Sequence, residues 1–246
     1  MKPEDFIPKL VSKKGHNVVV YQQEICSEEL KVEANVKKAL EKESGLSVEV
    51  EGVWGSTLHH IDDLSYDPHE YLPHIYGKFR EKSQDVKVRP LLETPAKGDL
   101  IGPKEKSKDI SEGEKFMPEL SDFGFKEAPK HDKRSCLKFV GGADKGHERL
   151  EAYMKKSVGH YNDTRNGLLG SEYSSKLSPW LQNGSLSCRE VFWATQDYIK
   201  KSGGNTSTKV YIDELFWRDF NRYWCMRYKN KVFSSYGIYD REYYNW

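Results

Sequence analysis

The sequence predicts an α/β region that is followed by a linker and then by an all-α region. Three observations support this prediction: a strand–helix–strand pattern near the N-terminus, a polar middle segment, and apolar residues at helical spacing after it. We place the α/β region at residues 1–84, the linker at 85–135 and the helical region at 136–246. A chain of 246 residues is long enough for one large domain or two small ones.

The first region begins with a helix and continues as a βαβ unit. A helix is predicted over residues 3–13, because Pro3 suits a first turn and apolar residues follow at helical spacing. A short buried strand at 18–21, a helix that begins at Ser27 and a strand at 48–54 come next. Two strands joined through a helix should be parallel with a right-handed crossover, so the region is predicted to be Rossmann-like.

This α/β region contains too few strands for a complete domain. Parallel sheets are usually covered on both faces and built from several strands, whereas only two are predicted here. The opening helix also has no preceding strand to pack beside. We therefore expect the chain to be truncated at its N-terminus.

Histidine and aspartate residues gather after the second strand. Neighbouring His59 and His60 would point apart, and no spacing of the HExxH kind is present. We expect a polar loop here, then a helix over residues 71–82, and no metal site. The residues concerned are His59, His60, Asp62, Asp63, His69 and His74.

The predicted linker is rich in Lys, Glu, Pro, Gly and Ser, and few apolar positions recur in it. Such a composition is typical of an extended and partly flexible segment. A short helix is predicted near residues 117–125.

Charge and composition exclude several classes of protein. Lys plus Arg is 39 and Asp plus Glu is 38, so a net charge of +1 requires any contact with DNA to come from a local patch. No apolar run approaches the about 20 residues needed to cross a bilayer, and the start MKPEDF lacks a signal-peptide pattern. Four dispersed cysteines without CxxC spacing favour a reducing, intracellular compartment.

Helical signals dominate the last region. Ser187 and Glu190 form a capping box that begins one helix, and Gly203–Gly204 ends it. A further, amphipathic helix is predicted from Thr208 to Trp224, or from about Tyr211 to Tyr228. Aromatic residues fill its second half and the tail, which needs a surface that would bury it.

A donor-rich loop precedes these helices. Ser174-Ser175-Lys176-Leu177-Ser178-Pro179 places three hydroxyls, one cation and several backbone N–H groups within six residues, which can wrap a phosphate. An ordinary loop with local caps is the alternative. Tyr211, Glu214 and Arg218 share one face of the later helix.

Several longer strings carry a resemblance to a known family. YNDTRNGLLG, YSSKLSPWL, NGSLSCRE and ELFWRDFNRY resemble, in this order, the FAD-binding region of the DNA photolyase and cryptochrome family. VWGSTLHHIDDL and FVGG resemble its DASH branch. The resemblance implies a partial α/β antenna domain, a linker, and the first half of a helical FAD-binding domain.

The resemblance also implies an activity. Members use FAD and blue light to repair cyclobutane pyrimidine dimers, with single-stranded DNA as the expected partner and a folate, 5,10-methenyltetrahydrofolate, as the expected antenna. A blue-light receptor of the same family is one rival, and a non-catalytic truncated isoform that acts as a binding fragment is another. Neither a membrane nor a metal is expected as a partner.

Site residues follow from the matching strings. The resemblance implies that FAD is held by Tyr161, Ser174, Ser175, Lys176, Leu177, Ser178, Tyr211 and Arg218. It implies that Glu214 and Trp217 face the dimer as catalytic residues, that Arg165 contacts DNA phosphate, and that Glu24 binds the folate.

The residues alone leave other roles open. Trp217 could be a core residue, and Glu214 and Glu24 could be solvated acids. Without the family, an ion pair of Arg218 with Asp219 or with a neighbouring residue would be the favoured interpretation of that arginine.

Two departures from the family pattern stand out. After SPWL the family usually has Ala-Phe-Gly-Cys-Ile-Ser, whereas residues 182–187 here read Gln-Asn-Gly-Ser-Leu-Ser. The family's later helices, which enclose the flavin ring, would follow Trp246. We therefore expect an incomplete version of the parent that neither holds FAD stoichiometrically nor repairs dimers by itself. Targeting of the parent to a chloroplast or mitochondrion stays open.

Overall fold

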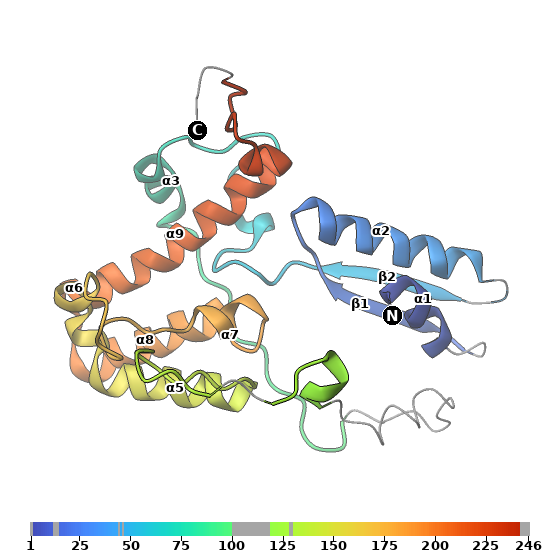
Figure 1. Ribbon diagram of the computed structural model, residues 1–246. Coiled ribbons are helices and arrows are strands. Elements are labelled where there is room, and N and C mark those ends of the chain that lie inside the picture. The colour runs from blue at the N-terminus through green and yellow to red at the C-terminus, as the bar shows by residue number, and fades with distance from the viewer. Residues whose placement is uncertain are drawn as a thin grey trace. The chain divides into compact units, whose positions relative to one another are not determined.

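The computed structural model describes residues 2–11, 15–43, 45, 47–99, 119–127 and 130–241 (Figure 1). Contacts group the chain into two compact units. The first holds Met1–Tyr21, Lys31–Glu51 and Leu92–Ser135, and the second holds Gln22–Leu30, Gly52–Leu91 and Cys136–Trp246. Residues 52–84, predicted with the α/β region, belong to the second unit here. The division into three domains at 84/85 and 135/136 stays a prediction.

The βαβ unit is confirmed. Its elements are α1 (Pro3–Leu10), β1 (Asn17–Gln22), α2 (Ser27–Lys42) and β2 (Val48–Val53). The strands are parallel, because Asn17 N–H donates to the Ser47 carbonyl at 3.1 Å and Gln23 N–H donates to Val53 at 2.9 Å. Helix α1 ends at Leu10, and the predicted end at Lys13 lies outside the described residues.

The first strand was predicted to be buried, but only one of its faces is partly buried. Val18 and Val20 are 47% and 60% exposed, and their neighbours along the strand are half-buried. Helix α2 covers the other face, where the Lys37 ammonium lies 5.2 Å from the centre of the Tyr21 ring. Side chains alternate between the faces of a strand, so covering one face leaves the two valines in solvent.

Most of the described residues from 136 onward are helical, as predicted, and they belong to the second unit. Its main helices are α3 (Tyr76–Ser83), α5 (Ala143–Lys156), α6 (Tyr161–Thr164), α7 (Ser178–Gln182), α8 (Cys188–Ser202) and α9 (Thr206–Tyr228). Short 3₁₀ turns lie at Ile61–Asp63, Val158–His160 and Lys229–Phe233. Helix α9 contacts α3, α6 and α8, and therefore organises the unit (Figure 1).

Local signals fix the ends of these helices. Ser187 and Glu190 form the predicted capping box of α8, and Gly203 ends that helix with a φ of 82°. Asn205 caps α9 by accepting from the Thr208 N–H at 3.0 Å. Side-chain caps satisfy N–H groups that have no partner within the helix, so both helices begin at fixed residues.

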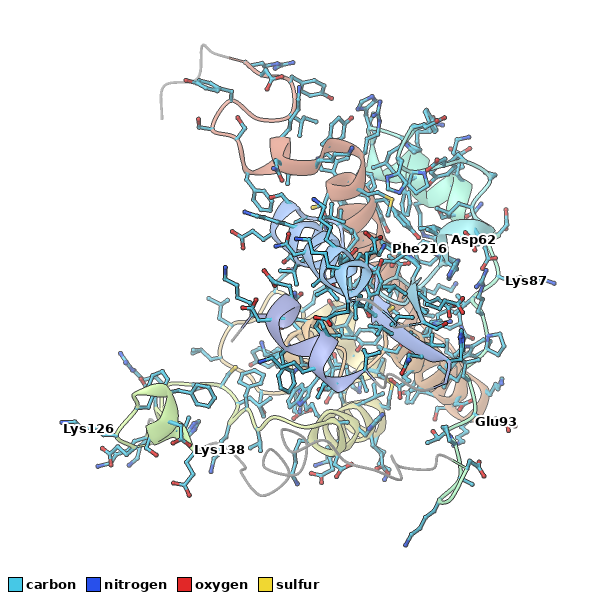
Figure 2. The ribbon with its side chains drawn as sticks, turned by 90° about the vertical axis from the view of Figure 1, so that its right-hand side faces the viewer. Asp62, Lys87, Glu93, Lys126, Lys138 and Phe216 are labelled. Atoms are coloured by element: carbon cyan, nitrogen blue, oxygen red, sulfur yellow. The ribbon has the colours of Figure 1, made fainter. Side chains whose placement is uncertain are left out.

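The core of the second unit lies around α9. Tyr153, Phe79 and Tyr223 are fully buried, and Phe216 lies among packed side chains while Lys87 projects from the ribbon (Figure 2). The polar loop predicted after the second strand is present, but its residues Ser56–His59 are buried, as is Trp54. Its backbone is held by Asp219, as described below. Helix α3 begins at Tyr76, five residues after the predicted start at Tyr71.

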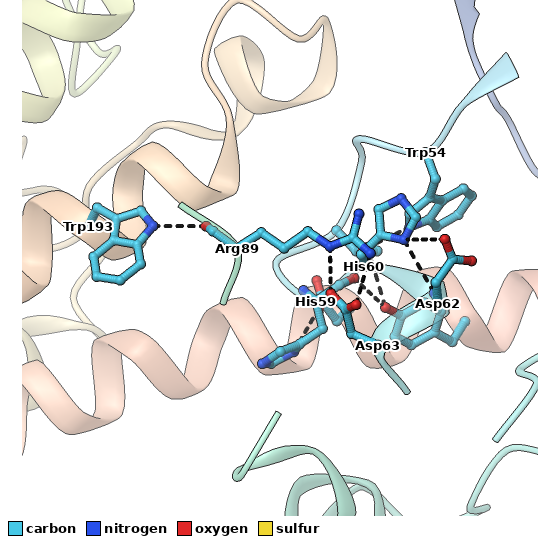
Figure 3. A network of polar contacts seen from close by, with 10 residues as sticks. Trp54, His59, His60, Asp62, Asp63, Arg89 and Trp193 are labelled. Atoms are coloured by element: carbon cyan, nitrogen blue, oxygen red, sulfur yellow. Dashed lines mark hydrogen bonds and ion pairs between the residues drawn. The ribbon is translucent and has the colours of Figure 1, made fainter. Parts of the chain in front are cut away.

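The beginning of the predicted linker is fixed within the second unit. Arg89 donates two hydrogen bonds to Asp63, at 2.7 and 2.8 Å, and its carbonyl accepts from the Trp193 indole at 3.1 Å (Figure 3). Further along, a 3₁₀ turn occupies Leu120–Phe123, within the helix predicted near 117–125. Residues 117 and 118 lie outside the described ranges.

Across the described ranges, no helix combines the length and apolar character that a membrane span requires.

Candidate ligand-binding site beside helix α9

A cavity of about 470 Å³ lies in the second unit beside α9. Its walls come from the segment after β1, from the end of α7 and from α9. The lining residues are Glu24, Ile25, Cys26, Gln182, Glu214, Trp217, Arg218, Asn221, Arg222 and Cys225. Two carboxylates, two guanidinium groups and one indole therefore face a single space, which suits a ligand with both a flat ring and polar edges.

Glu214 is held in a small polar network. Arg165, which follows α6, donates from Nη1 to Glu214 Oε1, and both side chains are more than one third exposed. The Tyr161 hydroxyl interacts with both groups. Burial and the negative charge of Glu214 raise the pKa of Tyr161, while Arg165 opposes the change. Three predicted site residues therefore meet at one point.

Trp217 is neither a core residue nor a freely exposed one. Its ring stacks on Tyr76 with centroids 3.6 Å apart and planes 10° from parallel, and its side chain remains 40% exposed. Tyr76 is itself fixed, because its hydroxyl donates to the Asp213 carbonyl at 3.1 Å. One face of the indole is thus supported from α3, and the residue lines the cavity.

Arg218 does not pair with Asp219. Arg218 donates from Nη1 to the Ser56 carbonyl. Asp219 is fully buried and accepts from the N–H groups of Leu58 and His59 at 2.8 and 2.9 Å, with His59 Nδ1 at 3.3 Å. The ion pair with Asp219 is therefore wrong, because consecutive residues of a helix point in different directions and the two side chains have separate partners.

Glu24 lines the same cavity as Glu214 and Trp217. One of its oxygens accepts from Arg222 Nη2 at 2.9 Å and the other from Gln22 Nε2 at 3.1 Å. The predicted folate residue and the predicted dimer-facing residues therefore share one cavity, although the family resemblance implies separate ligands for them.

The Ser174–Ser178 loop lies beside the beginning of α9 and does not line this cavity. The Ser175 side chain lies close to the hydroxyl of Tyr211, whose pKa is raised by burial against the opposing effect of Ser175. Tyr211 also contacts the edge of the Tyr161 ring, with centroids 5.1 Å apart. Because Tyr211 and Glu214 are three residues apart on α9, the loop and the cavity meet along one helix.

The backbone of this loop has an unusual conformation. Lys176 has a φ of 57°, and Leu177, which is buried, follows with right-handed angles of −85° and −6°. Such a left-handed and right-handed pair turns successive N–H groups toward one concavity. Within the described part of the chain, the N–H groups of residues 174–177 donate to no backbone or side-chain acceptor. The loop therefore presents free donors.

Arg149 supports the loop and was missed from the sequence. Its guanidinium donates to the carbonyls of Ser171, Ser174 and Ser175 at 2.7, 3.2 and 2.8 Å, and pairs with Glu172 at 2.8 Å. Only 9% of the residue is exposed. Nothing in its spacing on α5, beside Leu150, distinguishes it from a surface arginine.

No cluster of three or more potential metal ligands is found among the described His, Cys, Asp and Glu residues. Of the histidines that follow β2, His59 is buried against Asp219, and His60 Nδ1 lies 3.3 Å from Asp62 (Figure 3).

Comparison with known proteins identifies the family. The family model described as DNA photolyase matches residues 1–96. "Cryptochrome DASH" of Gloeobacter violaceus is 38% identical over 239 residues, which cover 96% of this chain and 45% of that protein. "Cryptochrome DASH, chloroplastic/mitochondrial" of Solanum lycopersicum is 36% identical over 252 residues, which cover 96% of this chain and 42% of that protein.

A solved structure agrees with these relatives. The crystal structure of the Synechocystis cryptochrome matches with a TM-score of 0.87 and 33% identity, over 98% of this chain and 48% of that one. The chain thus spans about half the length of the curated relatives it matches. Sequence and structure agree on one assignment: the chain belongs to the DNA photolyase and cryptochrome family, and the relatives that it matches here are DASH cryptochromes.

Proposed function

We propose that the whole protein repairs cyclobutane pyrimidine dimers in DNA, with FAD and blue light, and that it prefers single-stranded DNA. The observation that carries this proposal is the convergence of Glu214, Trp217 and Arg218 on one cavity, with Arg165 bound to Glu214 at its edge. The family assignment supplies the reaction class, and the cavity supplies side chains suited to a flat base with polar edges.

The described residues fit the phosphate side of FAD. The free N–H groups of residues 174–177 and the left-handed turn at Lys176 form a concavity that suits phosphate oxygens. We propose that this loop, with the hydroxyls of Ser174, Ser175 and Ser178, holds the two phosphates. When bound, FAD would supply the light-driven electron chemistry, while the protein binds and orients it.

Other predicted FAD residues would act from α9 and α6. Tyr211 and Tyr161 are buried next to the loop and would form a wall behind the cofactor. Arg218 uses one nitrogen for the Ser56 carbonyl, which fixes its side chain at the cavity wall. A guanidinium has five N–H donors, so the remaining ones are available to a ligand.

On the DNA side, we propose that Glu214 accepts hydrogen bonds from a base edge and that Trp217 stacks on a pyrimidine ring. A base taken out of a strand is read through hydrogen bonds to its edge and through aromatic stacking. Because Tyr76 supports one face of the Trp217 ring, the indole is already oriented before a ligand binds. Arg165 would bind the phosphate next to the dimer.

We further propose that Glu24 contacts an antenna folate. Its carboxylate lines the cavity and could accept N–H groups of a pterin ring, in competition with Gln22 and Arg222. Titration with 5,10-methenyltetrahydrofolate tests this role. Weaker binding by Glu24→Gln but not by Glu28→Gln is expected, and equal binding by both variants would remove Glu24 from the folate site.

A chimaera tests the main proposal. These 246 residues would replace the matching half of the Synechocystis relative, and the product would be loaded with FAD and given a dimer-containing oligonucleotide. We expect blue light, but not darkness, to restore the undamaged bases, and to do so faster in a single strand than in a duplex. Flavin photoreduction without repair would contradict the proposal and favour the rival role of a blue-light receptor.

We infer that the protein works in a reducing compartment inside the cell, since Cys26, Cys136, Cys188 and Cys225 are all free thiols. The relative from Solanum lycopersicum is named chloroplastic/mitochondrial, which makes an organelle the compartment to test. A fluorescent fusion of the whole protein that enters neither organelle would contradict an organellar location.

A further inference from the structure

We propose that Arg165 is an exchangeable counter-ion of Glu214, which a phosphate group of the ligand draws away so that the carboxylate becomes free for a base. This inference rests on the proposed function, because the ligand concerned is DNA. It assigns to the Arg165–Glu214 pair a coupling role in which recognition of the backbone and recognition of the base strengthen each other.

The exposure of the pair makes exchange possible. The side chains of Arg165 and Glu214 are 38% and 39% exposed, so water and ligands reach both groups. Pairs of this kind are only weakly held. A phosphate can compete well for the guanidinium, because it offers oxygens in the same forked geometry as a carboxylate and binds arginine strongly.

Comparison with other arginines of the unit shows that Arg165 is held differently. Arg149 is buried and donates to three backbone carbonyls, and Arg218 donates to the Ser56 carbonyl, so both are fixed to the chain. The Arg165 side chain contacts Glu214 and Tyr161 and donates to no backbone carbonyl among the described residues. Its guanidinium can therefore move without breaking a backbone contact.

Tyr161 keeps the carboxylate in place when Arg165 leaves. The tyrosine is 8% exposed, and its ring packs edge-on against Tyr211 at 5.1 Å, so it cannot follow the arginine. Its hydroxyl interacts with Glu214 as well as with Arg165. After exchange, Glu214 would stay beside this hydroxyl and have free oxygen lone pairs, which a base N–H can use. Tyr161 is thus a positioning residue for Glu214.

The coupling predicts opposite responses to one substitution. Glu214→Gln removes the charge that holds Arg165, so a strand with phosphates but no bases should bind more tightly. The same change weakens the acceptor for a base, so a strand with thymines should bind less tightly. Removal of an exposed ion pair of this type should change the affinity about two- to fivefold.

The test uses the 246-residue chain and two single strands of equal length, one fully abasic and one of thymidylates. Affinities would be measured by fluorescence anisotropy at one fixed salt concentration, for the wild type, Glu214→Gln and the double variant Arg165→Gln/Glu214→Gln. Asp213→Asn is the matched control, because it removes the same charge at the neighbouring position, where the carboxylate pairs with Arg80. Glu214→Ala would replace Glu214→Gln if that variant does not fold.

We expect Glu214→Gln to bind the abasic strand about two- to fivefold more tightly than the wild type, and to bind the thymidylate strand less tightly. The double variant should show no gain in affinity for the abasic strand. A gain that persists without Arg165, or that Asp213→Asn reproduces, would overturn the inference, since it would reflect net charge alone. The proposed function fails separately if the wild type shows no preference for thymidylate over the abasic strand. Absence of binding to both strands would overturn both.

Discussion

At the scale of single residues, Asp219 shows how one carboxylate positions the site. It is fully buried, and its two oxygens accept from the N–H groups of Leu58 and His59 at 2.8 and 2.9 Å. These bonds hold the segment around Ser56 against α9, and the Ser56 carbonyl in turn fixes Arg218. The orientation of a cavity residue therefore depends on a neighbour that does not line the cavity.

Replacement of Asp219 by alanine should destabilise the chain strongly. The change leaves two buried N–H groups without an acceptor, each at a cost of about 1–3 kcal/mol, so we expect a loss of about 3–5 kcal/mol in the free energy of unfolding. Urea unfolding measures it. Asp213→Ala is the control, because that carboxylate pairs with Arg80 at a half-exposed site and should contribute at most about 1 kcal/mol. Similar losses in both variants would contradict this role of Asp219.

At the scale of elements, the donor-rich loop Ser174–Ser178 is supported from α5. Glu172 accepts from Arg149 at 2.8 Å and from the Ser157 hydroxyl at 2.9 Å. Burial by itself would raise the pKa of Glu172, but the hydrogen bonds from Arg149 and Ser157 outweigh it and lower the pKa below its usual range. The ionised carboxylate thus belongs to the folded loop.

This lowered pKa makes a prediction about pH. A carboxyl with a lower pKa in the folded state adds stability above its unfolded value of about 4.3, and the contribution disappears as the pH falls through the folded value. Glu172→Gln should therefore lower the free energy of unfolding by about 1 kcal/mol at neutral pH. This difference in unfolding free energy from the wild type should shrink as the pH falls below about 4.

Urea unfolding between neutral and acidic pH measures this difference. Glu148→Gln, on the exposed side of α5 beside Lys145, is the control and should differ little from the wild type at any pH. A difference for Glu172→Gln that stays constant, or grows in acid, would show that the carboxylate does not support the folded loop.

Local signals in the sequence predicted much of this element structure. The capping box at Ser187 and Glu190, the βαβ spacing and the helix that contains Tyr211, Glu214 and Arg218 were predicted and are present. Each depends on residues a few positions apart, which sequence patterns show directly. The contact between Tyr161, Arg165 and Glu214 joins positions about 50 residues apart, and the sequence did not predict it.

Contacts that depend on tertiary packing were not predicted. The burial of Trp54–His59 follows from Asp219, more than 150 residues later in the chain. The stacking of Tyr76 on Trp217 and the support of the loop by Arg149 are equally non-local. Exposure of Val18 and Val20 was missed because a strand of β-branched residues resembles a buried one in sequence.

At the scale of the whole molecule, α9 connects two parts of one proposed reaction site. Its beginning lies beside the donor-rich loop, and its middle carries Glu214, Trp217 and Arg218 along the cavity. If the loop holds phosphates of FAD, the same helix would place the dimer-facing residues at a fixed position relative to the cofactor. Substitutions in the loop would then change the binding of FAD, whereas substitutions of the dimer-facing residues would change repair.

The most direct test of this account is the rate of repair per bound flavin in the chimaera with Glu214→Ala. We expect repair per flavin to fall at least about tenfold, corresponding to about 1.4 kcal/mol, because a hydrogen bond to a charged group contributes about 1.5–3 kcal/mol. Flavin content should stay unchanged, and Asp213→Ala should affect neither quantity. A fall in flavin content with unchanged repair per flavin would instead assign Glu214 to the cofactor or the fold, and would contradict the proposed site.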